Sequence, residues 1–205
     1  TLVEFLEQVS LVADSDPGAD SDGMRRVHGA FWHGAERFSR YGVAPPYPLQ
    51  GGKGREGTMR KRVTVAVLFG GASQEHDVSV VSAQQLMDAA DARRIEVVPV
   101  YMDFENRFFT GPTLRDVATF RPRPPRLSEV TFAWGAEGPE MRGPGGARGI
   151  DCVLPVFHGP FGEDGRVQAA FELIGIPVTG FSATGSALAM RKDATKALVK
   201  SAGVN

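Results

Sequence analysis

Apolar runs separated by polar, glycine-containing turns predict an α/β fold over residues 62–180. Residues 63–69 and 151–157 are nearly continuous apolar runs, typical of strands that are covered on both faces. The predicted strands are 63–69, 96–101, 151–157 and 176–179, and the predicted helices are 78–92 and 166–174. Each strand, helix, strand unit makes a right-handed parallel crossover. We therefore expect a small parallel sheet with flanking helices, and ligands at the loops that follow the strands.

Helical spacing also predicts which positions of the two helices contact the sheet. In the first helix these are Val78, Val81, Leu86 and Ala89 or Ala90. In the second helix they are Val167, Ala170, Phe171 and Ile174, and Gly175 is expected to end that helix.

The segments outside this pattern are of three kinds. Residues 1–58 combine a short amphipathic stretch with acidic and basic polar runs, so we expect a poorly structured or extraneous segment. We expect the natural start at Met59, directly before the first strand. Residues 103–149 form a long excursion, with a hairpin predicted about Asn106, and a surface loop is favoured there over a functional flap. Two further helices are predicted within 183–205.

Composition excludes several classes of function. The 205 residues carry 23 Lys and Arg against 24 Asp and Glu, so no charge excess favours nucleic acid or an anionic membrane. We find no apolar run of the roughly 20 residues that a membrane span requires, and we expect no export signal. The single cysteine, Cys152, lies in a predicted strand, which favours a core position and a cytoplasmic protein.

Two polar loops are the candidates for chemistry. The first, 70–77, places Glu75 at a helix N-terminus, where the helix dipole stabilises a carboxylate that could bind an ammonium group. The second, 158–165, follows a buried strand and begins at His158. The alternative interpretations are a simple preference for acidic residues at helix starts, and a histidine that only caps a strand. The lysines at 192, 196 and 200 are typical of a solvated helix face.

Two stretches together resemble the N-terminal domain of D-alanine–D-alanine ligases. They are VAVLFGGASQEHDVSVVSA at 65–83 and HGPFGEDGRVQAAFELIGIPVTG at 158–180, the second continued by SALAMRKDATKALVKSAGV at 186–204. The resemblance implies a pre-ATP-grasp, Rossmann-like half at 62–180, and the start of an ATP-grasp domain at 183–205. Residues 1–16 separately resemble a short piece of superfamily-1 DNA helicases, without any nucleotide-binding motif.

The resemblance implies an activity and its cofactors. Family members use ATP and Mg²⁺ to convert one D-alanine into an acyl phosphate, and the amine of a second D-alanine then attacks it to give the dipeptide used for peptidoglycan. The substrate partner would be D-alanine, and a homodimer is one option because the family commonly dimerises through this region. An amino-acid-binding module without ATP chemistry, or a ligase that makes D-alanyl-D-lactate or D-alanyl-D-serine, is the alternative.

The resemblance also assigns individual residues. Glu75 matches the glutamate that holds the ammonium of the first D-alanine, and His158 matches the histidine that reaches the reacting acyl group. Gly159 is assigned to substrate binding and Glu163 to orienting that site, and Lys192 matches a lysine that reaches the nucleotide phosphates. Those three assignments rest on the resemblance alone.

The chain also departs from the family pattern. Arg191 stands where Asp is usual and puts the Lys192 contact in doubt, Ala169 replaces a common Gly, and Val178 replaces an aromatic residue. The family's metal-binding carboxylates, oxyanion arginine and serine-bearing flap correspond to positions beyond residue 205. We therefore expect this chain alone to be inactive.

Overall fold

The computed structural model describes residues 62–120 and 124–203. Among these, residues 64–90 and 96–203 belong to one compact unit, and residues 62–63 and 91–95 belong to another. The prediction for 1–58 lies outside the described residues. Among the residues that are described, no helix has the length and apolar character needed to span a membrane.

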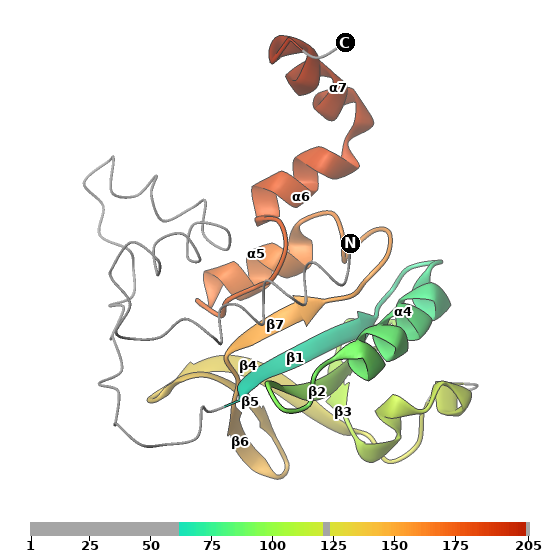
Figure 1. Cartoon of the computed structure of the whole chain (residues 1–205), viewed down its shortest axis with the longest axis vertical. Coiled ribbons are helices and arrows are strands. Elements are labelled where there is room, and N and C mark those ends of the chain that lie inside the picture. Colours follow the sequence, from blue (N-terminus) through green and yellow to red (C-terminus); the bar gives the residue numbers. More distant parts are fainter. Residues whose placement is uncertain (1–61, 121–123, 204–205) are drawn as a thin grey trace. The chain divides into compact units, whose positions relative to one another are not determined.

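The parallel strands form as the apolar runs predict. Strand β1 (Val63–Gly70) leads to helix α4 (His76–Ala89) and then to β2 (Ile95–Met102), and β7 (Cys152–Pro155) lies on the other side of β1 (Figure 1). β1 and β7 are parallel, in a register that runs from Val65 opposite Cys152 to Leu68 opposite Pro155. The carboxyl ends of these strands therefore lie at one edge of the sheet.

Helix α5 (Arg166–Leu173) completes the second crossover, because the chain returns from it to the edge of β7. The predicted strand 176–179 is reduced to one parallel bridge between Val178 and Val153. Gly175 has a φ of 77°, which ends the helix in the expected left-handed conformation.

The excursion at 103–149 is not a surface loop, and that prediction was wrong. It forms four short strands that extend the sheet in antiparallel fashion, in the order β6-β5-β4-β3-β2-β1-β7. The added strands are β3 (Phe108–Thr110), β4 (Ser128–Gly135), β5 (Gly138–Gly143) and β6 (Gly146–Gly149), with 3-10 turns at Pro112–Arg115 and Val117–Phe120. The hairpin about Asn106 is confirmed, because it joins β2 to β3.

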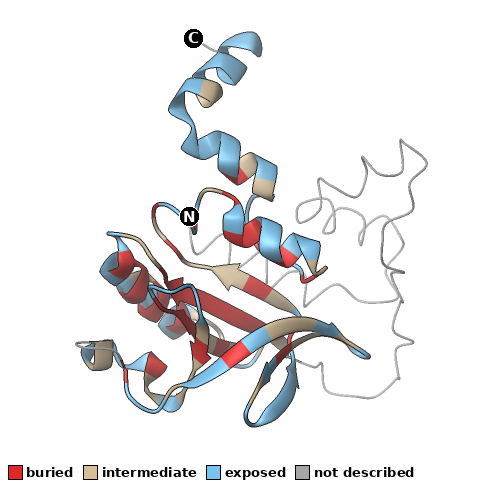
Figure 2. Ribbon diagram, turned by 180° about the vertical axis from the view of Figure 1, so that it is seen from behind, coloured by how far each residue is buried: buried red, intermediate tan, exposed pale blue. Residues whose placement is uncertain are grey.

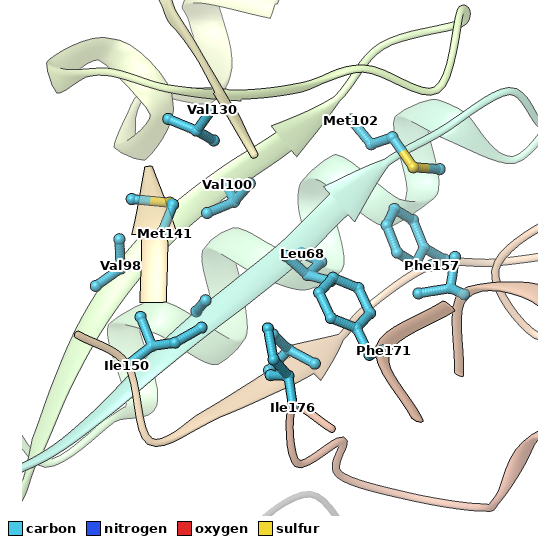
Figure 3. Close-up of a cluster of buried hydrophobic side chains, with 13 residues drawn as sticks. Leu68, Val98, Val100, Met102, Val130, Met141, Ile150, Phe157, Phe171 and Ile176 are labelled. Atoms are coloured by element: carbon cyan, nitrogen blue, oxygen red, sulfur yellow. The ribbon is translucent and has the colours of Figure 1, made fainter. Parts of the chain in front are cut away.

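The sheet has a buried core on each face. Successive side chains along β1 point to opposite faces: Ala66 and Leu68 join a cluster with Phe157 and Phe171, while Val67, between them, is buried outside that cluster. In Figure 3, Phe171 and Ile176 lie in front of the sheet and α4 lies behind it. The core therefore positions both predicted loops at the same sheet edge.

The predicted inward face of α4 is confirmed at Leu86 and wrong at Val78 and Val81. The helix begins at His76 rather than at residue 78, and Val78 and Val81 are 54% and 45% exposed. The buried positions are His76, Ser79, Val80, Ala83, Gln84, Leu86 and Met87. Polar residues occupy part of the buried face because they hydrogen-bond to backbone and side-chain groups of the elements that they contact.

Two helices follow the sheet. Helix α6 (Ala183–Met190) is capped by Ser182, whose side chain accepts a hydrogen bond from the Gly185 N–H. Helix α7 (Lys192–Ser201) has no buried residue, and Figure 2 shows it mostly exposed. The lysine stripe is therefore solvated.

Candidate functional site

The loops that follow β1 and β7 are tied together by a buried serine of α4. The Gly70 N–H donates to Ser79 Oγ at 2.9 Å, and the same hydroxyl donates to the Val156 carbonyl oxygen at 2.6 Å. Ser79 has no exposed surface. One hydroxyl thus joins the end of β1 to the segment that leaves β7, and it fixes the separation of the two loops.

Glycine is required where the first loop starts. Gly70 has a φ of 94°, and a Cβ there would lie 2.5 Å from the Met102 carbonyl oxygen. The chain turns sharply at this point, and α4 begins six residues later with Glu75 as its N-cap residue. Glu75 therefore lies at the helix N-terminus, as predicted, although its side chain makes no capping hydrogen bond.

The two loops meet where Glu75 faces Gly159. A Cβ at Gly159 would lie 2.7 Å from Glu75 Oε2 and 2.8 Å from Ser73 Oγ, and Gly159 has a φ of 74°. Both the conformation and the contact therefore require glycine. Residues 84 positions apart in the sequence, Glu75 and Gly159, share this edge of the sheet.

His158 lies between a serine and a glutamate. Its Nε2 is 3.0 Å from Ser82 Oγ, and its Nδ1 is 3.8 Å from Glu163 Oε1. The other oxygen of Glu163 accepts a hydrogen bond of 2.7 Å from the Gly159 N–H. The His158 and Glu163 side chains are 35% and 46% exposed, so both remain accessible to a ligand.

The structure brings four of the five predicted residues together and leaves the fifth apart. Glu75, His158, Gly159 and Glu163 occupy the two adjoining loops. Lys192 is the first residue of α7 and is exposed, and none of the described contacts joins it to the loops.

Arg191, which precedes Lys192, forms a two-pronged ion pair with Asp193. The hydrogen bond from Arg191 holds the pKa of Asp193 below its ordinary value. Arg191 therefore pairs with a residue of the first turn of α7, Asp193.

Sequence reasoning missed three residues of α4 that support the loops. His76 is buried, its Nδ1 lies 2.8 Å from the Gly71 carbonyl oxygen, and its ring stacks on Phe104 with centroids 4.5 Å apart. Ser79 and Ser82 are the other two. Their spacing of three was the available signal, because it places polar side chains at successive turns of one helix.

The chemistry that this edge can perform follows from its groups. A carboxylate beside a hydroxyl can bind a small ammonium group, and an imidazole close to it can donate a hydrogen bond to an oxygen that gains charge. Among residues 62–120 and 124–203, no three His, Cys, Asp or Glu side chains are grouped as a metal site. The described residues therefore do not form a Mg²⁺ site by themselves.

A separate groove of about 640 Å³ lies between α5 and strands β3 and β4. Its walls are mainly apolar and include Phe108, Phe132 and Phe171. None of Glu75, His158 or Glu163 lines it. Phe161 of the second loop also lines the groove, so the groove borders that loop but does not include the three predicted polar side chains.

Comparison with known proteins gives a consistent result. Residues 64–181 match the sequence model of a family described as "D-ala D-ala ligase N-terminus". A D-alanine–D-alanine ligase of Chlorobium limicola is 36% identical over 156 residues, covering 70% of this chain and 42% of the relative. A D-alanine–D-alanine ligase of Methylobacterium sp. is 38% identical over 157 residues, covering 70% of this chain and 38% of the relative. The chain thus spans about two fifths of the length of these relatives.

Solved structures agree. The VanG D-Ala:D-Ser ligase from Enterococcus faecalis matches with a TM-score of 0.62 and 30% identity, over 71% of this chain and 43% of that one. The D-alanine–D-alanine ligase from Coxiella burnetii matches with a TM-score of 0.59 and 27% identity, over 69% of this chain and 42% of that one. The mixed sheet with flanking helices is therefore shared with these proteins.

Proposed function

The chain belongs to the D-alanine–D-alanine ligase family, and from that premise we propose that it supplies the D-alanine-binding edge of an ATP-dependent ligase. The reaction joins two D-alanines through an acyl phosphate, for peptidoglycan precursor synthesis in the cytoplasm. The observation that carries the proposal is the meeting of the two loops, in which Gly159 lies against the Glu75 carboxylate and His158 precedes it in the chain.

Glu75 binds the ammonium group of the first D-alanine in this proposal. Its carboxylate is exposed, lies at the N-terminus of α4 and adjoins the Ser73 hydroxyl, which also accepts from the Glu75 N–H at 3.1 Å. A carboxylate in this position can form a charge-assisted hydrogen bond with an ammonium. The neighbouring Gly159 leaves room beside it that any larger residue would fill.

His158 acts on the carboxyl end of the same D-alanine. An N–H of its imidazole donates to the acyl oxygen as negative charge develops there, which lowers the barrier to attack by the second amine. Glu163 orients the ring and, through its bond to the Gly159 N–H, holds the loop in place. In this proposal Glu75 contacts the ammonium end of the D-alanine and His158 contacts its carboxyl end.

The nucleotide is assigned to a different part of the chain. ATP supplies the phosphoryl group, and Lys192 would contact its phosphates from the start of α7. Because the described residues do not form a Mg²⁺ site, we assign the metal no ligand here. We further propose that the 205-residue chain alone does not ligate, since it spans two fifths of its relatives.

Titration calorimetry of the 205-residue chain with D-alanine tests the ammonium contact. We expect weak binding, about −4 kcal/mol or a millimolar Kd. Glu75→Gln should weaken it at least about tenfold, because a hydrogen bond to a charged group contributes roughly 1.5–3 kcal/mol. Glu137→Gln, in the turn between β4 and β5, is the matched control and should change nothing. Equal binding by wild type and Glu75→Gln would contradict the assignment.

A chimera tests the chemistry. Residues 62–205 would replace the corresponding part of the Chlorobium limicola relative, and D-alanine-dependent release of ADP would be measured. We expect turnover, and His158→Asn should lower kcat by about 10²–10³, the usual cost of removing one donor to a developing oxyanion. A folded chimera whose turnover is insensitive to His158→Asn would remove the histidine from the reaction.

A further inference from the structure

Helix α4 contributes a second serine, Ser82, that contacts the proposed catalytic histidine directly. Ser82 Oγ lies 3.0 Å from His158 Nε2, across 76 residues of sequence. A serine inside a helix commonly bonds to the carbonyl one turn before it, but this hydroxyl is directed to the imidazole. Ser82 is half-buried and does not lie in either loop. It is therefore placed to act through the ring of His158.

The position of the ring proton follows from the groups on either side. A neutral imidazole has one nitrogen that donates and one that accepts, and the hydrogen bond at one nitrogen sets the role of the other. Nδ1 lies 3.8 Å from the Glu163 carboxylate, which favours the proton on Nδ1. Nε2 is then the acceptor, and the Ser82 hydroxyl is the donor.

The same geometry leaves the Nδ1 proton available. A separation of 3.8 Å is too long for a direct hydrogen bond, and the Glu163 oxygen that comes closest to the backbone is engaged by the Gly159 N–H at 2.7 Å. The Nδ1–H group therefore makes no direct hydrogen bond to Glu163 and can donate to a ligand. The proposed function places the D-alanine beside Gly159, the next residue in the chain.

We propose that Ser82 is a positioning residue that fixes the Nδ1–H tautomer and the orientation of His158 by donating to its Nε2. The inference rests on the proposed function, because the Nδ1 proton is useful only if His158 donates to a reacting oxygen. Ser82 contacts neither the substrate nor the nucleotide. When the ring becomes positively charged, the same hydroxyl can accept from Nε2–H, so the contact holds in both protonation states.

Nitrogen NMR of the 205-residue chain, labelled with ¹⁵N at its four histidines, measures the tautomer directly. The His158 signals are assigned by their loss in His158→Gln. At alkaline pH the wild type should show His158 mainly as the Nδ1–H form. In Ser82→Ala the ratio of Nδ1–H to Nε2–H should fall about three- to tenfold, the equivalent of one hydrogen bond.

Two further variants separate positioning from a general effect on the fold. Ser82→Thr keeps the hydroxyl and should restore the wild-type ratio, whereas Ser128→Ala removes an exposed hydroxyl on β4 and should leave it unchanged. Circular dichroism should show that α4 persists in Ser82→Ala, because alanine favours helix. An unchanged ratio in Ser82→Ala, or a failure of Ser82→Thr to restore it, would overturn the inference.

The tautomer measurement is independent of the D-alanine titration that tests the proposed function. The tautomer is measured without substrate, so it reports on Ser82 and His158 alone. A wild-type chain that does not bind D-alanine would contradict the proposed function and leave the tautomer result intact. A chain that binds D-alanine while Ser82→Ala keeps the wild-type tautomer would contradict only the inference.

Discussion

Replacing Ser79 with alanine should destabilise the fold far more than the loss of one hydroxyl normally does. The Ser79 hydroxyl is fully buried and makes two backbone contacts, with the Gly70 N–H at 2.9 Å and the Val156 carbonyl at 2.6 Å. Ser79→Ala leaves both partners without this hydrogen bond. A buried polar group left unpaired costs about 1–3 kcal/mol, so we expect a loss of about 2–4 kcal/mol in the free energy of unfolding.

Ser82→Ala is the matched control, because it makes the same change one turn further along the same helix. Its hydroxyl is half-buried and has one side-chain partner, so its loss should cost about 0.5–1.5 kcal/mol. Urea unfolding followed by circular dichroism gives both values. For a chain of this size the Ser79 variant should also lower Tm by about 6–12 °C. If Ser79→Ala costs no more than Ser82→Ala, the hydroxyl does not join the strand ends.

Three further predictions concern the site and its surroundings. Gly159→Ala should cost about 1–2 kcal/mol of stability because the φ of Gly159 is 74°. It should also weaken D-alanine binding, because the new Cβ would displace the Glu75 carboxylate. Gly145→Ala is the control, since a Cβ there meets nothing within 4 Å. Burial, followed by the nearby Asp151 carboxylate, raises the pKa of the Cys152 thiol to about 12, so its reaction with a disulfide reagent at pH 8 should be about a thousandfold slower than after unfolding. Burial opposes the charge of Asp103, but hydrogen bonds from the next residues of the hairpin hold its pKa below the ordinary value. The ionised Asp103 therefore stabilises the fold fully above the unfolded pKa of about 3.9, and this stabilisation is lost as pH falls through the lower folded pKa. Asp103→Asn should lower the free energy of unfolding by about 1–2 kcal/mol at pH 7 and by little at pH 2. A difference between wild type and variant that is the same at both pH values would contradict this.

The parallel half of the sheet was predictable because its strands are buried by their own side chains. Val65 to Phe69 is an unbroken buried run, and such a run can be recognised without knowledge of its neighbours. The antiparallel half gives no such signal. In β5 and β6 only Met141 is buried, and the two strands are formed mainly by backbone pairing with β4 and with each other. Sequences of this kind take their structure from the register of the adjoining strand.

Part of the buried face of α4 was mispredicted for a related reason. Apolar periodicity points to Val78 and Val81, but Gln84 is buried instead, because its side chain donates to the Leu114 carbonyl oxygen at 2.8 Å. A hydrophobic pattern cannot detect a polar residue whose burial depends on a partner 30 residues away. The same limit applies to Ser82, whose partner is 76 residues away. By contrast, Glu75 and His158 were recognisable because their loops, 70–77 and 158–165, each directly follow a predicted strand.

The polar residues of α4 follow the sheet edge in a geometrically determined order. In an α-helix each step of three residues turns back by about 60°, so His76, Ser79 and Ser82 cannot all face one strand. His76 contacts Gly71 and lies 3.3 Å from the Tyr101 hydroxyl of β2. Ser79 joins the end of β1 to the segment after β7, and Ser82 reaches His158 beyond β7.

Along α4 the strand contacted by these polar residues therefore changes from β2 to β1 and then to β7, which is the order of the parallel strands in the sheet. Serines three apart on this helix can therefore reach both the ends of β1 and β7 and the histidine that follows β7. Residues four apart would turn forward by about 40° for each step and would diverge from β7. Moving the serine from position 82 to 83, in the double variant Ser82→Ala and Ala83→Ser, should therefore fail to restore the His158 tautomer. Restoration by that variant would show that the contact does not depend on the helical phase.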